Sequence, residues 1–213
     1  MSQVIIKSDQ EYQYQTTHDS AVVYHFPEKI TVKSEKYHWS MILLHWATLI
    51  ILLATVVTVL AWDNIEDRAI RKILIDSHRQ IGMLVLVLVT ARFSVKLFTK
   101  APKYQMNRLL CFCIGICHYS LYSLLISIPL LGIALTLSHN TPVSLFGLVN
   151  LPNLVGTDPD IADLFTDYHV LLSWALLGLV TLHMVSALIH HYLLKDAVLI
   201  SMLPAMENKS LKK

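Results

Sequence analysis

Charged residues are scarce in this sequence. Asp, Glu, Lys and Arg make up 15% of its 213 residues and hydrophobic residues 54%, whereas a typical soluble domain has about 25% charged residues. This deficit argues against an ordinary soluble protein and favours a membrane protein. The formal net charge is only +2, so the composition gives no reason to expect a nucleic-acid partner.

Cysteine is also rare, and its three residues fall in one apolar stretch. Cys111, Cys113 and Cys117 form no CxxC pair, and their odd number argues against a disulfide framework. We interpret them as small residues in the core of a helix. The polar segment 1–36 has no basic stretch followed by a short apolar run, so we do not expect a cleaved signal peptide.

Four apolar stretches are long enough to cross a membrane, which takes about 20 helical residues. They are residues 37–62, 73–97, 109–137 and 168–194. The second is the weakest, because it contains Asp76, Arg79, Arg92 and Lys96. These charges cluster near its ends, where Lys and Arg side chains can reach the interface. We therefore predict an all-α membrane protein built as a four-helix bundle.

The segments between the spans differ in charge. Residues 92–108 contain five Lys or Arg and no acidic residue, whereas residues 138–167 contain four Asp and no Lys or Arg. The positive-inside rule then places the first segment in the cytoplasm, the second outside, and both termini in the cytoplasm. Prolines and glycines make 138–167 an ordered external loop, with room for a short surface helix. The predicted organisation is a cytoplasmic segment 1–36, a helical domain 37–204 and a cytoplasmic tail 205–213.

Five histidines lie within the predicted spans, where polar side chains are costly and usually face the bundle interior. They are His45, His78, His118, His169 and His183. His169 and His183 are 14 residues apart, which is about 21 Å along a helix and nearly the same helix face. One face of the fourth span thus presents an imidazole near each membrane surface.

Depth in the membrane pairs the other histidines with these two. His78 lies near the outer surface, as does His169, and His45 lies at the depth of His183 near the inner surface. His118 lies at about the depth of His45, so spacing alone leaves it open as an inner ligand. A lone histidine is more often a core residue bonded to a neighbouring helix, but this arrangement predicts two bis-histidine sites stacked across the membrane.

Each predicted site has two histidines at the same depth in the membrane and apolar surroundings, which favours haem over zinc as the bound group. Structural zinc requires four clustered N or S ligands, whereas haem iron takes axial imidazoles. Gly82, four residues after His78, either leaves room for a porphyrin or allows close helix packing. Iron with two histidine ligands has no open position, so electron transfer is the expected task.

An ordered set of short motifs runs through the four spans. They are Lys36-Tyr37, Leu44-His45-Trp46, His78-Arg79-Gln80-Ile81-Gly82, Ala91-Arg92, His118-Tyr119-Ser120-Leu121-Tyr122, Ile128-Pro129-Leu130-Leu131-Gly132, His169, Leu182-His183, His190-His191-Tyr192-Leu193-Leu194-Lys195-Asp196 and Met202-Leu203-Pro204. In this set the sequence resembles the bacterial cytochrome b561 family, the small dihaem cytochromes of the inner membrane. The resemblance extends from about residue 36 to residue 204.

The resemblance implies two haems b. In the family pattern His45 and His183 would bind the inner haem, and His78 and His169 the outer haem. His118 would then lie near the ligands or the propionates without binding iron.

Family members similar to this sequence oxidise superoxide and reduce ubiquinone, so the resemblance implies an electron path from superoxide through both haems to quinone. Lys36, where many relatives have arginine, could pair with a haem propionate. His190, seven residues after His183, would either border the quinone pocket and relay protons or anchor the helix at the interface. A basic cluster at the outer end of the second span would either steer the anion or simply flank the helix. It consists of Arg68, Arg71, Lys72 and Arg79.

Two other functions remain open at this point. The first is a haem-bearing anchor subunit that passes electrons between a partner dehydrogenase or hydrogenase and quinone. The second is a non-enzymatic haem or signalling protein that merely binds haem. The mixed charge of the loop after the first span and the lack of a large external domain favour the stand-alone oxidase. A homo-oligomer or a redox partner subunit is compatible with each of these functions.

Overall fold

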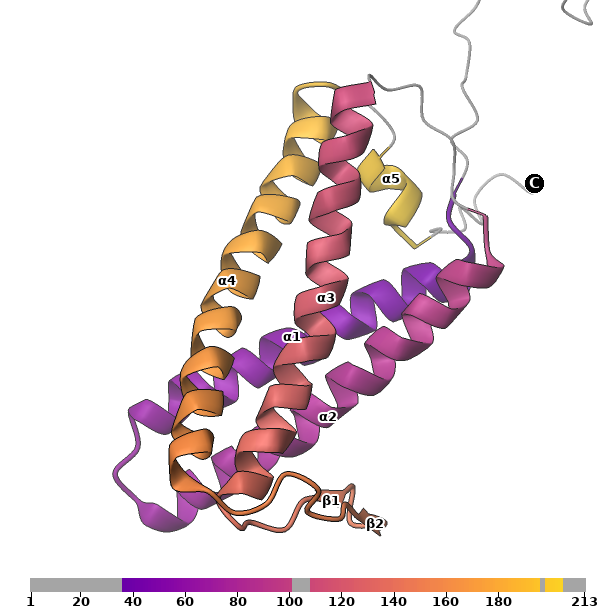
Figure 1. Cartoon of the computed structure of the whole chain (residues 1–213). Helices are drawn as coiled ribbons and strands as arrows, with labels where there is room; N and C mark the ends of the chain where they lie inside the picture. The colour runs from indigo at the N-terminus through magenta and orange to yellow at the C-terminus, as the bar shows by residue number, and fades with distance from the viewer. Residues whose placement is uncertain (1–35, 101–107, 196–197, 205–213) are drawn as a thin grey trace, which may run out of the picture. The chain divides into compact units, whose positions relative to one another are not determined.

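The computed structural model describes residues 36–100, 108–195 and 198–204, so the predicted cytoplasmic segments lie outside the described residues, apart from Lys36. Four long helices follow one another, with a small β-hairpin before the fourth and a short helix after it (Figure 1). The elements are α1 (Trp39–Asp63), α2 (Arg68–Phe98), α3 (Arg108–Ser138), β1 (Ser144–Leu145), β2 (Val149–Asn150), α4 (Pro159–Tyr192) and α5 (Val198–Met202).

The four long helices are each long and apolar enough to cross a membrane. They contain 25 to 34 residues, and a bilayer core of about 30 Å needs about 20 residues of helix. Large apolar side chains such as Leu53, Phe112 and Trp174 are exposed along them. Apolar surface of this extent is suited to lipid rather than water. The prediction of an all-α, multi-pass membrane protein is confirmed.

Two helices begin earlier than the predicted spans because aspartates cap them. The carboxylate of Asp67 accepts hydrogen bonds from the backbone N–H groups of residues 69 and 70, at 2.8 and 3.0 Å, and α2 starts at Arg68. Asp158 caps α4 in the same way, and Pro159 follows it as the first helical residue. Residues 159–167, which we expected in the external loop, therefore form the first turns of α4.

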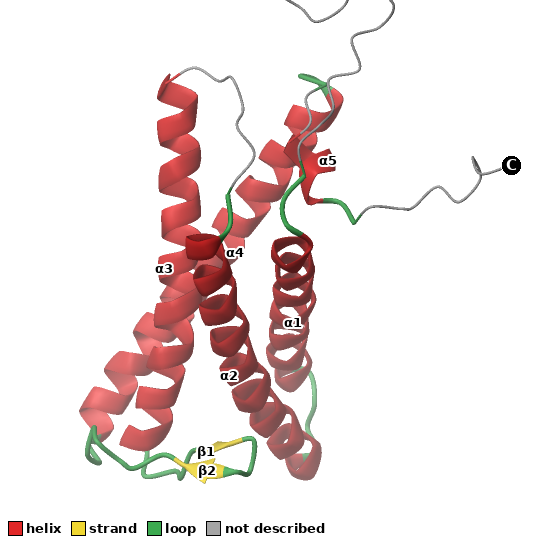
Figure 2. Cartoon of the chain, turned by 90° about the vertical axis from the view of Figure 1, so that its right-hand side faces the viewer, coloured by secondary structure: helices red, strands yellow, loops and turns green. Residues whose placement is uncertain are grey.

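The long helices form two helical hairpins. α1 packs along α2, α3 packs along α4, and α2 also contacts α3 (Figure 2). One cluster of buried apolar residues lies midway along the helices and consists of Val85, Val89, Leu125, Ile128 and Leu176. In the described part of the chain, α4 makes at most marginal backbone contact with α1 and α2. The backbone of α4 is therefore well separated from the backbones of α1 and α2.

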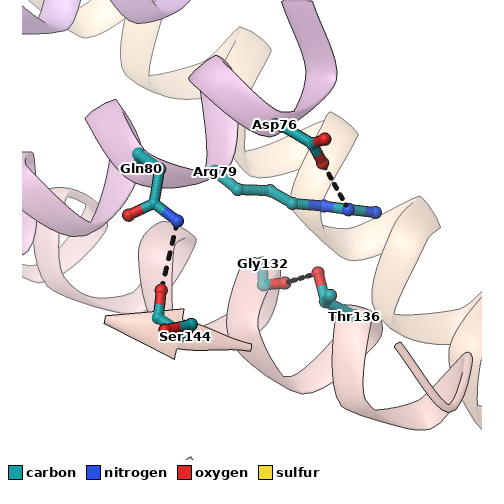
Figure 3. Close-up of polar contacts among 6 residues, drawn as sticks. All are labelled: Asp76, Arg79, Gln80, Gly132, Thr136 and Ser144. Carbon is teal, nitrogen blue, oxygen red and sulfur yellow. Dashed lines mark hydrogen bonds and ion pairs between the residues drawn. The ribbon is translucent and has the colours of Figure 1, made fainter. Parts of the chain in front are cut away.

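The β-hairpin lies at the end of the bundle where α1 connects to α2, which we call the hairpin end (Figure 1). Its strands pair antiparallel, with Ser144 opposite Asn150. The side-chain amide of Gln80 in α2 donates to the carbonyl oxygen of Ser144 at 3.1 Å (Figure 3), and its oxygen accepts from the backbone N–H of Phe146 at 3.1 Å. The hairpin is thus attached to α2 two residues after His78.

The opposite end of the bundle, which we call the α5 end, contains the start of α1 and the end of α4. The indole N–H of Trp46 donates a hydrogen bond to the carbonyl oxygen of Met202 at 2.9 Å. Nζ of Lys36 lies 3.5 Å from the carbonyl oxygen of Leu203. These contacts hold the C-terminal end of α5 against the first helix. Trp46 directly follows His45, so α5 is attached beside a predicted haem ligand.

Candidate functional site

His78 of α2 and His169 of α4 face each other at the hairpin end. Their ring centroids are 6.2 Å apart and their planes are inclined by 78°. An imidazole nitrogen binds a transition metal at about 2 Å, so two rings on opposite sides of one ion have centroids roughly 6 Å apart. The observed separation therefore fits one iron between the two rings.

Backbone carbonyls orient both of these rings. Nδ1 of His78 lies 3.2 Å from the carbonyl oxygen of Thr55 and 3.3 Å from the hydroxyl of Thr58. Nδ1 of His169 lies 3.0 Å from the carbonyl oxygen of Ile128. A carbonyl oxygen only accepts, so Nδ1 carries the proton in each ring. The lone pair of Nε2 is then available to a metal, as in most metal-binding histidines.

A cavity of about 850 Å³ surrounds these rings and is lined mainly by apolar side chains from all four long helices. This volume is near the upper end for small-molecule sites. Gly82 lines the cavity, and a Cβ added there would meet no atom within 4 Å. Open space beside Gly82 favours the porphyrin interpretation over close helix packing. The spacing of the rings, the apolar lining and the free Nε2 atoms all fit a haem.

A second pair of facing rings lies at the α5 end. The centroids of His45 and His183 are 6.4 Å apart, again the separation expected across one iron. His118 lies closer to His183, at 5.3 Å, and its Nδ1 donates to the carbonyl oxygen of Ile114 at 2.8 Å. The shorter separation fits a neighbour of the site better than a second axial ligand. Nδ1 of His45 is buried and has no hydrogen-bond partner.

Comparison with known proteins agrees with this arrangement. A family model described as "Prokaryotic cytochrome b561" matches residues 36–205 of the chain. The chain belongs to this family. Membership implies that it binds haem b and transfers electrons in a membrane.

Named relatives cover most of the chain. One from Yersinia pestis, "Probable superoxide oxidase CybB", is 29% identical over 78% of this chain and 91% of its own length. "Cytochrome b561 homolog 1" of Escherichia coli (strain K12) is 30% identical over 61% of this chain and 74% of its own length. "Cytochrome b561 homolog 2" from the same strain is 26% identical over 83% of this chain and 92% of its own length.

Two residues are candidates for a part in the reaction, Arg79 of the basic cluster and His190. Arg79 lines the cavity at the hairpin end. Its guanidinium forms an ion pair with Asp76 at 3.2 Å (Figure 3). Both side chains remain partly accessible, so an anion that approaches the cavity would meet a partly neutralised arginine. The rest of the basic cluster is at least partly exposed, namely Arg68, Arg71 and Lys72.

His190, the other candidate, is a buried side chain near the α5 end of α4, with 7% exposure. The next residue, His191, packs its ring edge-on against Tyr192 at 4.8 Å. An anchoring residue would place its polar group in the interface, so the burial of His190 favours a role inside the protein.

Arg92 of α2 belongs to the α5-end site, although sequence reasoning treated it only as a charge near a helix end. Its guanidinium carbon lies 5.5 Å from the ring centroid of Tyr122, and its Nε is buried without a hydrogen-bond partner. Arg92 is close enough for its charge to act on His45, His118 and His183. The α5-end site therefore has a cation in its neighbourhood.

Proposed function

We propose that this cytochrome carries single electrons across the bacterial inner membrane, from superoxide at the hairpin end to ubiquinone at the α5 end. The hairpin end would face outward, and both termini would be cytoplasmic, because the basic segment 92–108 and the acidic segment 138–167 obey the positive-inside rule in that orientation. The observation that carries the proposal is the presence of two facing histidine pairs at opposite ends of the same four helices. The name of the Yersinia pestis relative, "Probable superoxide oxidase CybB", supports superoxide as the donor.

In this proposal His78 and His169 hold the outer haem b, and His45 and His183 hold the inner one. Haem b supplies a one-electron carrier at each site. Histidine on both faces leaves no position for oxygen to bind the iron, which suits electron transfer. His169 and His183 lie about 21 Å apart along α4, so the two sites together span most of the bilayer core.

The overall reaction balances with two superoxide ions for each quinone. Each superoxide loses one electron and leaves as oxygen, and the quinone gains two electrons and two protons to become quinol. His190 is our candidate for supplying a proton to the quinone, because it is buried near the C-terminal end of α4 and an imidazole can both give up and take up a proton. His190→Ala should slow quinone reduction and leave haem content unchanged. Unchanged turnover in this variant would remove His190 from the mechanism.

Arg79 would attract superoxide toward the outer cavity, and Asp76 would oppose it. Arg79→Gln and Asp76→Asn change the charge by one unit in opposite directions at the same place. The rate of reduction by superoxide should fall in the first variant and rise in the second. Both differences should shrink as ionic strength rises, because salt screens exposed charges. A neutral reductant provides the control, and its rates should stay the same.

The central test uses the purified full-length protein in stopped flow, with superoxide as donor and with or without ubiquinone. We expect two haems per chain, reduction of both by superoxide, and reoxidation by quinone. His169→Ala should remove only the outer haem, and His183→Ala only the inner haem. A single haem per chain, or haems that superoxide does not reduce, would contradict the proposal.

One observation favours the alternative of an anchor subunit for a dehydrogenase or hydrogenase. Leu148 and Leu154, in and just after the β-hairpin, are 85% and 86% exposed, and apolar side chains at the end of a bundle can contact a partner. Copurification with an iron–sulfur subunit, together with a lack of reaction with superoxide, would support this function instead.

A further inference from the structure

Helix α2 repeats the spacing that places the two histidines of α4. His78 and Arg92 are 14 residues apart, as are His169 and His183. This spacing corresponds to about 21 Å along the axis and to nearly the same helix face. The face of α2 that presents His78 to the hairpin-end site therefore presents Arg92 to the α5-end site.

The surroundings of Arg92 leave part of its guanidinium without an acceptor. Tyr122 lies beneath it, and Nζ of Lys96 lies 4.8 Å from the centroid of the same ring. Nε of Arg92 is buried and has no hydrogen-bond partner. A buried donor without an acceptor costs free energy, and the cost is higher for a charged group. The environment of Arg92 is therefore one that an added anion would complete.

The protein provides no such anion nearby among its described residues. Arg79 at the hairpin end has Asp76 as its partner, which is the one ion pair within the described ranges. Every acidic residue in those ranges belongs to the hairpin-end half of its helix or to the loops there. They are Asp63, Glu66, Asp67, Asp76, Asp158, Asp160, Asp163 and Asp167. The α5 end therefore has a half-buried cation, Arg92, and no described carboxylate.

We infer that Arg92 binds a propionate carboxylate of the haem that His45 and His183 hold. This inference rests on the proposed function, which places a haem there. A guanidinium fits a carboxylate through two parallel hydrogen bonds and keeps its charge when buried. Lys36, the residue that the sequence suggested for this role, instead contacts the carbonyl oxygen of Leu203.

Two measurable properties follow from this role for Arg92. Loss of a charge-assisted hydrogen bond costs about 1.5–3 kcal/mol, so Arg92→Gln should bind the inner haem roughly 12-fold to 150-fold more weakly. A positive charge near the iron also favours the reduced state, so the same variant should lower the midpoint potential of the inner haem. Arg92→Lys keeps the charge and should recover part of both effects.

Lys96 offers a matched control. It is exposed, contacts the same tyrosine ring, and lies one helical turn further along α2. Lys96→Gln removes the same unit of charge and should change the potential and affinity of the inner haem less than Arg92→Gln does. The inner haem is identified as the component missing from redox titrations of His183→Ala.

The decisive experiment reconstitutes the haem-free full-length chain with haem b or with its dimethyl ester, which has no carboxylates. Arg92→Gln should weaken the binding of haem b but leave the binding of the ester at the wild-type level. Equal weakening of both compounds would make Arg92 a purely structural residue and overturn the inference. Unchanged affinity and potential in Arg92→Gln would also overturn it.

An anionic lipid is the other possible partner for this charge. If the phosphate of phosphatidylglycerol paired with Arg92, the inner haem potential of the wild type would depend on the phosphatidylglycerol content of the vesicle, and the inference would be wrong. Failure of the proposed function gives a different result. The wild type would then bind fewer than two haems, or His183→Ala would lose none.

Discussion

Substitution of Gly132 by alanine tests whether the ring of His169 has to stay where it is. A Cβ added to Gly132 would lie 3.2 Å from Cε1 and 3.5 Å from Nδ1 of His169. Ordinary contacts between carbon atoms are about 3.5–4.0 Å, so the ring or the helix must move by a few tenths of an ångström. The carbonyl oxygen that accepts from His169 belongs to Ile128, one turn earlier on the same helix. The movement therefore disturbs both the position and the hydrogen bond of this ring.

The expected magnitude follows from known costs of overpacking. An extra methyl group in a packed site costs about 1–3 kcal/mol, which corresponds to a roughly fivefold to 150-fold weaker haem site. Gly132→Ala should therefore lose haem from the hairpin-end pair, with His78 left without its partner. The pair His45 and His183 lies at the other end of the bundle and should keep its haem. The assay measures haem per chain and the redox titration of each component.

Gly178 provides the control, because a Cβ added there would meet nothing within 4 Å. Gly178→Ala should leave both haems in place, and the protein should gain up to about 1 kcal/mol from higher helix propensity. Full occupancy of both sites in Gly132→Ala, with unchanged potentials, would refute the assignment of His169 as a constrained ligand. Equal loss of both haems would show instead that the substitution disrupts the whole bundle.

Further predictions concern the two ends of the bundle and the fifth histidine. Gln80→Leu removes both hydrogen bonds that hold the β-hairpin, so its amides should exchange hydrogen faster in mass spectrometry while haem content stays the same. Trp46→Phe removes the bond to Met202, which is worth about 1 kcal/mol, so limited proteolysis should cleave α5 more readily. His118→Ala should keep two haems per chain by absorbance, because its ring centroid lies only 5.3 Å from that of His183, closer than two ligands of one iron would be. Loss of one haem would make His118 a ligand.

The fold was predictable because long charge-free stretches have few alternatives to transmembrane helices. The ends of the helices were less predictable, because hydropathy reports the part of a helix inside the membrane and not where the helix begins. Asp67 and Asp158 start α2 and α4 within polar sequence, where a capping aspartate looks like any loop aspartate. The attachment of the β-hairpin to Gln80 joins residues more than 60 positions apart, and no local pattern signals it.

The histidine pairs were predictable because a helix is a rigid rod with a fixed rise, so depth follows from counting residues. Depth could not choose between His45 and His118 as the partner of His183, since that choice depends on the direction of each ring. Arg92 was missed because a charge near a helix end usually reaches the interface. Arg92 follows His78 by 14 residues, the same spacing that separates His169 from His183. Applying this spacing to cations as well as to histidines would have revealed Arg92.

The two sites differ in how the protein supports their histidines. At the hairpin end, Nδ1 of His78 and of His169 both bond to carbonyl oxygens. At the α5 end, Nδ1 of His45 has no partner. A hydrogen bond from Nδ1 to a carbonyl makes the imidazole a stronger donor to the metal, and a stronger donor stabilises ferric iron. Iron held at the hairpin end should therefore be harder to reduce.

Charge acts in the same direction. Asp76 offsets the charge of Arg79 near the hairpin-end cavity, whereas no described carboxylate lies at the α5 end, where Arg92 would offset the negative charge of a propionate of the inner haem. We expect the inner haem to have the higher midpoint potential, so that an electron entering from outside moves downhill toward the quinone. Redox titration of the wild type and of His183→Ala checks this order. If the component lost in His183→Ala were the one of lower potential, the reasoning from hydrogen bonds and charge would be wrong, and the step from the outer to the inner haem would run uphill.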